Sequence, residues 1–242
     1  MKTKFNERAH EYHERAFIQR DLASWTGEWL EPEASSLQGV EFGAGTGHFT
    51  KLLVRAGLRI NAVDLSPRML KIGSRMVPQA SWLQGNAWIP AEIPLADRIY
   101  SSALLQWCQD PVETLFRWRA FLRPRGRLLC GFFVRDTLPE LTLALPGAEP
   151  FVWRNPKEWR KFFKGAGFEV IRAESSERIY RFENACAVLR YLHDIGSTDP
   201  GRFSATALRS AIRSYDSTFF DHDGVPSRWT FFRIECISGA DD

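Results

Sequence analysis

Long hydrophobic runs are absent from this chain. Its 242 residues contain no stretch of 18 or more apolar residues, so the sequence predicts no membrane-spanning helix and no membrane partner. Residues 1–17 are charged throughout and lack the apolar core of a signal peptide. We therefore expect a cytoplasmic protein.

Cysteine is also scarce, and the four that occur are far apart: Cys108, Cys130, Cys186 and Cys236. No CxxC pair is present, so the spacing argues against a cysteine-rich zinc site or a disulfide framework and predicts free thiols and no metal. The excess of positive over negative side chains is small too. The net charge of +3 is too small to indicate a nucleic-acid partner by itself.

What the chain does contain is an alternation of strand and helix patterns. Its composition, 44% hydrophobic and 25% charged, is typical of a globular protein that buries a full core. Apolar runs predict strands at 37–45, 59–65, 80–87, 97–107, 127–134, 168–175 and 228–237. Helical spacing predicts intervening helices at 48–57, 66–76, 111–122 and 155–168. Such alternation predicts one α/β domain with a mostly parallel sheet and helices on both faces.

A glycine-rich loop follows the first predicted strand. Gly43, Gly45 and Gly47 stand at every second position, and Glu41 lies two residues before the first of them. The GxGxxG dinucleotide pattern fails at its third glycine, and no Walker lysine follows. Glycines at the carboxyl end of a strand let a ligand approach the backbone closely.

A second acid completes the pattern. Asp64 ends the second predicted strand, where its two carboxylate oxygens are placed to bind two ribose hydroxyls. Together these features resemble the class I S-adenosylmethionine (SAM) methyltransferases. The resemblance implies a seven-stranded, mostly parallel Rossmann-like methyltransferase sheet with helices on both faces and an inserted helical lid. It also implies SAM as the cofactor and S-adenosylhomocysteine as its product.

The same resemblance implies the cofactor-binding residues. The glycine loop would face the methionyl part of SAM, and the segment after the third strand would meet the adenine amine. An acid usually stands there, whereas this chain has Asn86, whose amide oxygen also accepts a hydrogen bond, and Ala87 offers a backbone N–H. The predicted set is Tyr12, Gln19, Glu41, Gly43, Ala44, Gly45, Gly47, Asp64, Leu65, Met69, Asn86, Ala87, Ser102 and Leu104.

Three further stretches resemble one subfamily, the biotin-pathway malonyl-[acyl-carrier protein] O-methyltransferases. They are residues 5–20, with Phe5, Ala9, Tyr12, Ala16 and Gln19 in matching places, residues 101–141, with Gln106, Trp107 and the run 138–141, and residues 188–199. The resemblance implies O-methylation of the free carboxylate of a malonyl thioester on an acyl-carrier protein, an early step of biotin synthesis. We expect a monomeric enzyme.

The implied chemistry makes modest demands on side chains. A carboxylate is ionised at pH 7, so no general base is required, and no Ser/His/Asp or Cys/His arrangement is evident. We expect Tyr12, Trp107 and Arg135 to position the substrate, with Arg135 pairing with the malonyl carboxylate. The predicted substrate-binding set is Tyr12, Gln106, Trp107, Arg135, Tyr191 and His193. For Tyr12, Trp107, Arg135, Tyr191 and His193, packing or solvent exposure is the alternative interpretation. His48 is expected to start a helix and face solvent.

The predicted organisation is a single methyltransferase domain over residues 1–242. Within it we expect an N-terminal helical lid at 1–30, a SAM-binding core at 31–134, a strand and helix segment at 135–176, and an inserted substrate lobe at 177–228 between the last two strands. Two helical patterns, 183–196 and 204–220, fall in this lobe. Arg202, Arg209 and Arg213 would suit docking of an acidic carrier protein, or simply face solvent.

Two other functions remain open from the sequence. One is a SAM-dependent methyltransferase acting on another small-molecule carboxylate, or on a quinone or phenol. A phenol would require a base near the methyl group, and none is evident. The other is a SAM-fold assembly factor that transfers no methyl group. Such a protein would be expected to lose the glycine loop or the ribose acid, and this chain has both.

Overall fold

The computed structural model describes residues 2–32, 37–148, 152–197 and 203–239. Its centre is a seven-stranded sheet with the order β3-β2-β1-β4-β5-β7-β6. Five strands are parallel and β7 is antiparallel to both of its neighbours. The strands are β1 Gln38–Phe42, β2 Arg59–Asp64, β3 Ser81–Gln84, β4 Ala96–Ser102, β5 Leu122–Phe133, β6 Phe168–Phe182 and β7 Val225–Ser238. This confirms the predicted seven-stranded, mostly parallel Rossmann-like sheet.

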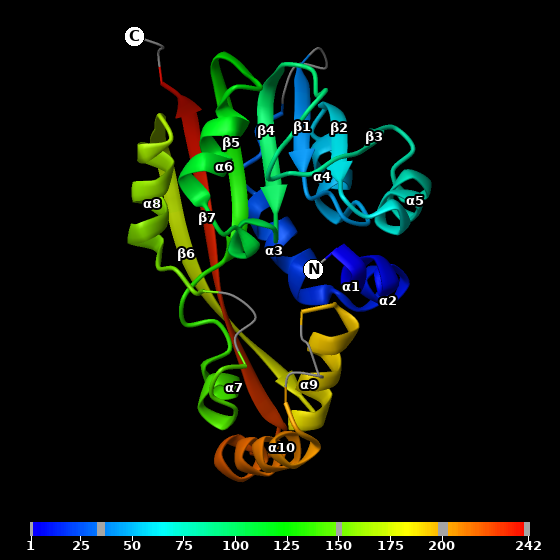
Figure 1. The fold of residues 1–242 in the computed structure, drawn as a ribbon, viewed down its shortest axis with the longest axis vertical. Coiled ribbons are helices and arrows are strands. Elements are labelled where there is room, and N and C mark those ends of the chain that lie inside the picture. The colour runs from blue at the N-terminus through cyan, green and yellow to red at the C-terminus, as the bar shows by residue number, and fades with distance from the viewer. Residues whose placement is uncertain (1, 33–36, 149–151, 198–202, 240–242) are drawn as a thin grey trace.

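Helices connect the parallel strands and cover both faces of the sheet (Figure 1). They are α4 His48–Arg55, α5 Pro67–Met76, α6 Pro111–Arg119 and α8 Pro156–Gly165. Two of them begin where capping chemistry predicts. The Ser66 hydroxyl accepts a hydrogen bond from the Met69 N–H with Pro67 at the first turn, and Asn155 forms a capping box with Glu158.

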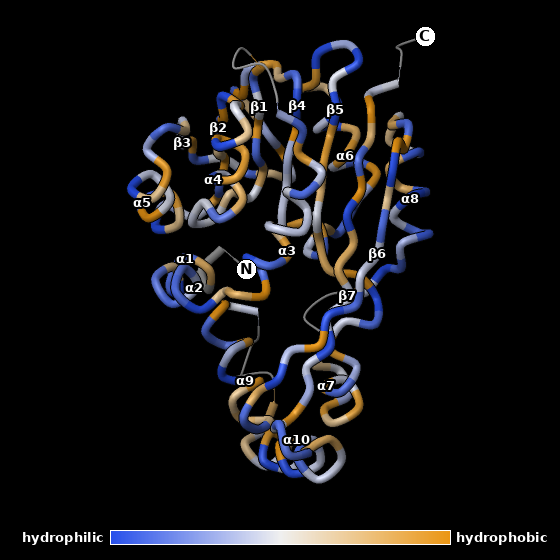
Figure 2. The backbone as a smooth tube through the Cα atoms, turned by 180° about the vertical axis from the view of Figure 1, so that it is seen from behind, coloured by the Kyte–Doolittle hydropathy of each residue, from blue (hydrophilic) through white to orange (hydrophobic). Residues whose placement is uncertain are grey.

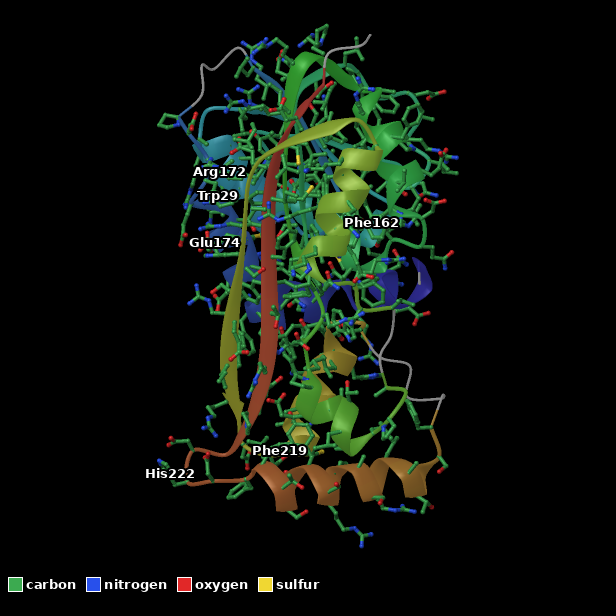
Figure 3. The ribbon with its side chains drawn as sticks, turned by 90° about the vertical axis from the view of Figure 1, so that its left-hand side faces the viewer. Trp29, Phe162, Arg172, Glu174, Phe219 and His222 are labelled. Carbon is green, nitrogen blue, oxygen red and sulfur yellow. The ribbon has the colours of Figure 1, made fainter. Side chains whose placement is uncertain are left out.

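The N-terminal segment folds as three helices: α1 Lys2–Glu7, α2 Ala9–Arg15 and α3 Phe17–Gly27. α3 packs on the sheet beside α4, and α1 and α2 lie below the carboxyl ends of the parallel strands (Figure 1). The segment just after α3 contacts β6, the edge strand of the sheet. Arg172 of β6 stacks on Trp29 at 4.4 Å and donates a hydrogen bond to its carbonyl (Figure 3).

β6 and β7 extend well beyond the other strands as a two-stranded ribbon. It carries a lobe of three helices: α7 Pro139–Ala144, α9 Ala185–Asp194 and α10 Ala205–Phe219 (Figures 1 and 2). Apolar side chains of α3, α7, α9, α10 and the ribbon share one core, with Leu22, Leu141, Leu192 and Tyr215 among its buried members. The lobe is therefore packed onto the N-terminal segment. None of the described helices is long and apolar enough to cross a membrane.

Several boundaries differ from those predicted, among them the start of β5, which lies at Leu122 instead of 127. The fourth strand ends at Ser102 instead of 107, because Ala103 has a left-handed φ of 55° and a short 3-10 helix, Leu105–Trp107, follows. The last two strands pair as far as Phe182 and Val225, so their connection spans 183–224 instead of 177–228. The extra residues of β6 are exposed or half-buried and mostly polar, whereas Val225 and Ser227 of β7 are buried, so this part of the sequence carries no continuous buried-strand pattern. α7 was not predicted.

Candidate active site

The site lies where the strand order reverses, between β1 and β4. A cavity of about 110 Å³ opens at the carboxyl ends of these strands. Its lining comes from the loops after β1, β2, β3 and β4 and from the N-terminal helices. The lining residues are Phe5, Tyr12, Gly43, Gly45, Asp64, Leu65, Ser66, Met69, Gly85, Asn86, Ala87, Trp88, Ser102, Ala103, Leu104 and Trp107. We call it the cofactor cavity.

The glycine loop forms one wall of the cofactor cavity. Gly43 and Gly45 have φ angles of +72° and +56°, which side-chain-bearing residues rarely adopt. A Cβ on Gly43 would also meet the Leu104 side chain at 2.8 Å. The loop therefore requires glycine for its backbone geometry, and it keeps the main chain bare towards the cavity.

Asp64 is held by the loops around it. Its Oδ2 accepts a hydrogen bond from the Gly45 N–H at 2.9 Å, and its Oδ1 accepts one from the Ser66 N–H at 2.8 Å. Each carboxylate oxygen has a second lone pair, so both can accept a further bond from a ligand. Burial raises the pKa of Asp64, while these backbone bonds act in the opposite direction.

A small side cavity of about 20 Å³ adjoins the glycine loop and holds the other acid. Glu41 lines it with Gln19, Ala44 and His48, and the Thr50 hydroxyl donates a hydrogen bond to Glu41. Burial raises the pKa of Glu41 to about 8, although the Thr50 bond opposes the shift. In the ligand-free protein this carboxyl is therefore largely protonated at neutral pH.

His48 does not face solvent as predicted. It begins α4, but its ring stacks on His13 with centroids 5.2 Å apart and lies 6.3 Å from the Tyr12 ring. Burial lowers its pKa to about 4, so the ring is neutral and packs like an aromatic side chain. Gly47 also departs from its predicted position. It does not line either cavity, because it caps α4 with φ +90° and packs against Trp82.

Six further residues of the predicted cofactor set lie together. Leu65, Met69, Asn86, Ala87, Ser102 and Leu104 all line the cofactor cavity. The Asn86 side-chain oxygen already accepts a hydrogen bond from the Trp88 N–H at 3.0 Å, which leaves one lone pair for a ligand. The Ser102 hydroxyl is buried and has no hydrogen-bond partner among the described residues. Buried polar groups are normally hydrogen-bonded, so this hydroxyl is available to bond a ligand.

A second cavity of about 40 Å³ lies between the sheet and the lobe. We call it the acceptor cavity. It shares Phe5, Tyr12, Ala103 and Trp107 with the cofactor cavity, so the two adjoin at these residues. The rest of its lining is mostly apolar: Gln19, Gln106, Phe133, Leu138, Leu141, Ala148, Trp153, Leu192, Ile195, Ser197 and Trp229. Among these described residues, Tyr12 is the only one with an ionisable side chain.

Tyr12 stands at the junction of all three cavities. Burial, and then the nearby charges of Asp64 and Glu41, raise the pKa of its hydroxyl above the ordinary value of 10. The hydroxyl has no protein hydrogen-bond partner in the described structure. It therefore keeps its proton and is available to donate it in a hydrogen bond to a ligand.

The helices that carry Tyr12 are tied to both halves of the molecule. Asn6 accepts hydrogen bonds from the Ser66 hydroxyl and from the Arg68 N–H, which joins α1 to the start of α5. On the other side, Arg15 forms an ion pair with Asp194 of α9. The N-terminal segment thus bridges the cofactor side and the lobe.

Arg135 was predicted to clamp the acceptor, and the structure contradicts this placement. Its side chain is 55% exposed, 3.9 Å from Glu158, and donates a hydrogen bond to the Trp153 carbonyl. The cause is the end of β5. Phe133 points into the acceptor cavity, and after Val134 the chain turns, so that Arg135 emerges on the outer surface.

Tyr191 and His193 also lie outside the lining of the acceptor cavity. The Tyr191 hydroxyl donates to the Gln19 side-chain oxygen at 2.8 Å and accepts from the Ile18 N–H. His193 contacts Arg8 through its Nε2. These two residues of α9 therefore hold the N-terminal helices in place. Gln106 and Trp107 do line the acceptor cavity, as predicted.

The sequence reasoning missed most of the acceptor wall. Leu138, Leu141, Trp153, Leu192, Ile195 and Trp229 come from four separate segments. Two of these segments, 138–141 and 188–199, had been noted for their resemblance, and that was the available signal. Their apolar side chains are indistinguishable from core residues in the sequence alone.

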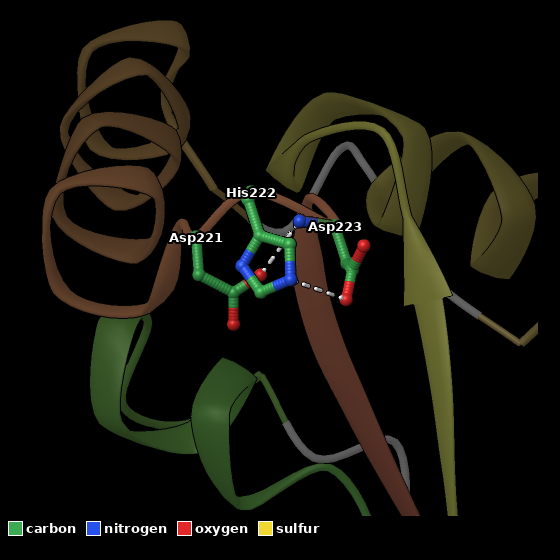
Figure 4. A group of neighbouring side chains, drawn as sticks. All are labelled: Asp221, His222 and Asp223. Carbon is green, nitrogen blue, oxygen red and sulfur yellow. Dashed lines mark hydrogen bonds and ion pairs between the residues drawn. The ribbon is translucent and has the colours of Figure 1, made fainter.

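One cluster at the far tip of the lobe has metal-ligating side chains, Asp221, His222 and Asp223 (Figure 4). Asp221 accepts a hydrogen bond from the Asp223 N–H and pairs with Arg181 at 2.7 Å. Its carboxylate is therefore already neutralised within a tight turn, and the cluster lies far from both cavities.

The comparisons agree with this geometry. Residues 40–130, which contain the glycine loop, Asp64 and β4, match the methyltransferase domain family. A putative methyltransferase structure from Bacillus halodurans superposes with a TM-score of 0.69 at 13% identity, over 90% of this chain and 99% of that one. A phosphoethanolamine N-methyltransferase from Haemonchus contortus in complex with SAM gives 0.59 at 17% identity, over 90% and 52%. The chain is a SAM-dependent methyltransferase.

Curated relatives define the family more closely. The malonyl-[acyl-carrier protein] O-methyltransferase of Halalkalibacterium halodurans is 31% identical over 96% of this chain and 95% of its own length. The biotin biosynthesis bifunctional protein BioHC of Cellvibrio japonicus is 25% identical over 89% of this chain, which spans 44% of that longer protein. The chain belongs to the malonyl-[acyl-carrier protein] O-methyltransferase family.

Proposed function

We propose that this enzyme methylates the free carboxylate of a malonyl thioester carried on an acyl-carrier protein, a step that serves biotin synthesis. The observation that carries the proposal is the acceptor cavity. It adjoins the cofactor cavity at Tyr12 and Trp107, and no described residue lining it offers a general base. A phenol or alcohol acceptor needs such a base, whereas a carboxylate is already ionised at neutral pH.

The residues of the cofactor cavity fit SAM. Asp64 would accept hydrogen bonds from the ribose hydroxyls through the lone pairs that Gly45 and Ser66 leave open. The free Ser102 hydroxyl and the bare backbone at Gly43 would face the methionyl part. Asn86 and Ala87 would meet the adenine edge. When bound, SAM supplies a methyl group on a positively charged sulfonium.

The protein's own contribution is to orient the acceptor carboxylate and to exclude water from it. Apolar walls such as Phe133 and Leu192 exclude water from a carboxylate that enters beside Trp107. Tyr12 donates a hydrogen bond to one carboxylate oxygen, which leaves the other oxygen free to attack. Holding reactants in line in this way contributes about 7–11 kcal/mol in favourable cases. The neutral ester product then loses its attraction to the site.

The test is methyl transfer to three acceptors by the purified enzyme: malonyl-carrier protein, malonyl-CoA and free malonate. We expect a methyl ester, detected by mass, with the highest kcat/KM on the carrier protein. Asp64→Ala serves as a control that should bind SAM poorly and turn over slowly. Tight SAM binding without ester formation on any of the three acceptors would overturn the proposal and favour another carboxylate.

A further inference from the structure

The outer face of α8 carries a row of basic side chains. Lys157, Arg160, Lys161 and Lys164 are all exposed. At 3.6 residues per turn they fall within an arc of about 100° around the helix axis. Trp159 and Phe163 are buried on the opposite side and anchor α8 to the core. We call these four residues the α8 basic stripe.

Most of the α8 basic stripe is not neutralised. Lys157, Lys161 and Lys164 form no ion pair within the described part of the chain, and Arg160 donates only to the Ala173 carbonyl. The single acid of the helix, Glu158, is engaged elsewhere. It closes the capping box at the start of α8 and lies 3.9 Å from Arg135. The stripe therefore presents a net positive surface in a protein whose overall charge is only +3.

The start of α8 is fixed close to the lining of the acceptor cavity. Trp153 lines that cavity two residues before the N-cap Asn155. The Arg154 guanidinium donates hydrogen bonds to the carbonyls of Cys108 and Gln109, just after Trp107. From there α8 runs away from the lobe along the outside of the sheet (Figures 1 and 3), so the α8 basic stripe begins close to residues that line the acceptor cavity.

We propose that the α8 basic stripe is the docking surface for the acidic carrier protein that bears the acceptor thioester. The inference rests on the proposed function and adds the place where the partner binds. Opposite charges steer encounter and orient the partner. A carrier seated on α8 delivers its acyl arm beside Trp153 into the acceptor cavity. In this arrangement α8 supplies the affinity for the carrier protein, so the acceptor cavity itself needs no positively charged side chain.

Two other basic surfaces are less suited to this role. Arg68, Lys71 and Arg75 form a comparable exposed stripe on α5, but α5 borders the cofactor cavity through Met69, and none of its residues lines the acceptor cavity. On α10, Arg209 and Arg213 are exposed at the far tip of the lobe, and no described α10 residue lines either cavity. Arg202 lies outside the described residues.

The α5 stripe supplies a matched control. The test variant is Lys157→Glu, Lys161→Glu, Lys164→Glu, and the control is Arg68→Glu, Lys71→Glu, Arg75→Glu, which makes the same change in net charge. Each is assayed with malonyl-carrier protein and with the malonyl thioester of N-acetylcysteamine, a short neutral carrier. Binding of malonyl-carrier protein is also measured directly by calorimetry at low and high salt.

We expect the α8 variant to lose about tenfold or more in kcat/KM and in affinity for the carrier protein at low salt, with a smaller loss at high salt. Turnover of the short thioester and the melting temperature should not change, and the α5 variant should resemble the wild type throughout. Equal losses in both variants, or a loss only in Arg209→Glu, Arg213→Glu, would overturn the docking site while the proposed function stands. Failure of the wild type to methylate either thioester would overturn the proposed function itself.

Discussion

The carboxylate of Asp64 accepts a hydrogen bond from the backbone N–H of Gly45 across 2.9 Å. This bond joins the end of β2 to the glycine loop after β1, so one side chain both shapes the loop and faces the cofactor cavity with free lone pairs. The two acids of the site therefore differ in role. Asp64 faces the cofactor cavity, whereas Glu41 lies beneath the loop with its oxygen held by Thr50.

The first prediction concerns Asp64. Asp64→Ala should lower SAM affinity by roughly 10- to 100-fold, because hydrogen bonds to a charged group contribute about 1.5–3 kcal/mol. Part of that loss comes from the loop, since the Gly45 N–H loses its acceptor. Isothermal titration calorimetry measures the effect, with Asp97→Ala, far from the cavity, as a control. Unchanged SAM affinity in Asp64→Ala would contradict the assigned role.

The second prediction concerns the conformation of Gly45. Its φ of +56° costs a side-chain-bearing residue about 1–2 kcal/mol, and more when the side chain is β-branched. Space is not the main obstacle, because a Cβ there would meet only the Tyr12 ring at 3.8 Å. Gly45→Val should therefore weaken SAM binding more than Gly45→Ala does. Equal affinities for the two variants would show that backbone strain is not decisive.

The third prediction separates the hydroxyl of Tyr12 from its ring. Tyr12→Phe should lower kcat/KM for the malonyl thioester about tenfold, the typical value of one hydrogen bond to a charged group, and leave SAM affinity nearly unchanged. Tyr12→Ala should impair both, since the ring separates the two cavities. A normal kcat/KM in Tyr12→Phe would contradict the hydrogen bond and leave Tyr12 with a packing role only.

The fourth prediction concerns Arg135. Because its side chain is exposed and pairs with Glu158, Arg135→Ala should keep kcat/KM for a short malonyl thioester within about twofold of the wild type. The pairing of Arg135 with the malonyl carboxylate that we expected from the sequence would instead imply a strong loss for this substitution. A large loss with unchanged melting temperature would restore Arg135 as a substrate ligand.

The fifth prediction concerns pH and Glu41. Burial raises its pKa from about 4.5 in the unfolded chain to about 8 in the folded protein. The folded state therefore holds a proton that the unfolded state releases. The stabilisation is complete below pH 4.5 and is lost as pH rises through 8, with a slope of up to about 1.4 kcal/mol per pH unit. Glu41→Gln removes this slope. Denaturant unfolding of both proteins from pH 5 to 8, without ligand, should show the wild type losing stability relative to the variant.

Much of the fold could be predicted from the sequence, because local signals coincide with the elements. Ser66 and Asn155 start α5 and α8 where their side chains cap the backbone, and Asp64 closes β2 as predicted. The long ribbon and α7 could not, because their stability depends on pairing between Phe182 and Val225 and on packing against the lobe. The residues that line the cofactor cavity after the strands could be predicted for the same reason, because they directly follow those strands in the sequence.

By itself the sequence determined most of the strands, the glycine loop and the acid at the end of β2, because these depend on residues close together in the chain. Only the tertiary structure decided how the acceptor site is built. Phe5, Phe133, Leu192 and Trp229 are distant in sequence and meet because the lobe folds back onto the N-terminal helices. In the structure the Arg135 side chain also lies on the surface, and the His48 ring packs against His13, both opposite to the expectation from the sequence. Side-chain direction at a strand end depends on the path of the following loop, and that path is set by packing across the whole domain.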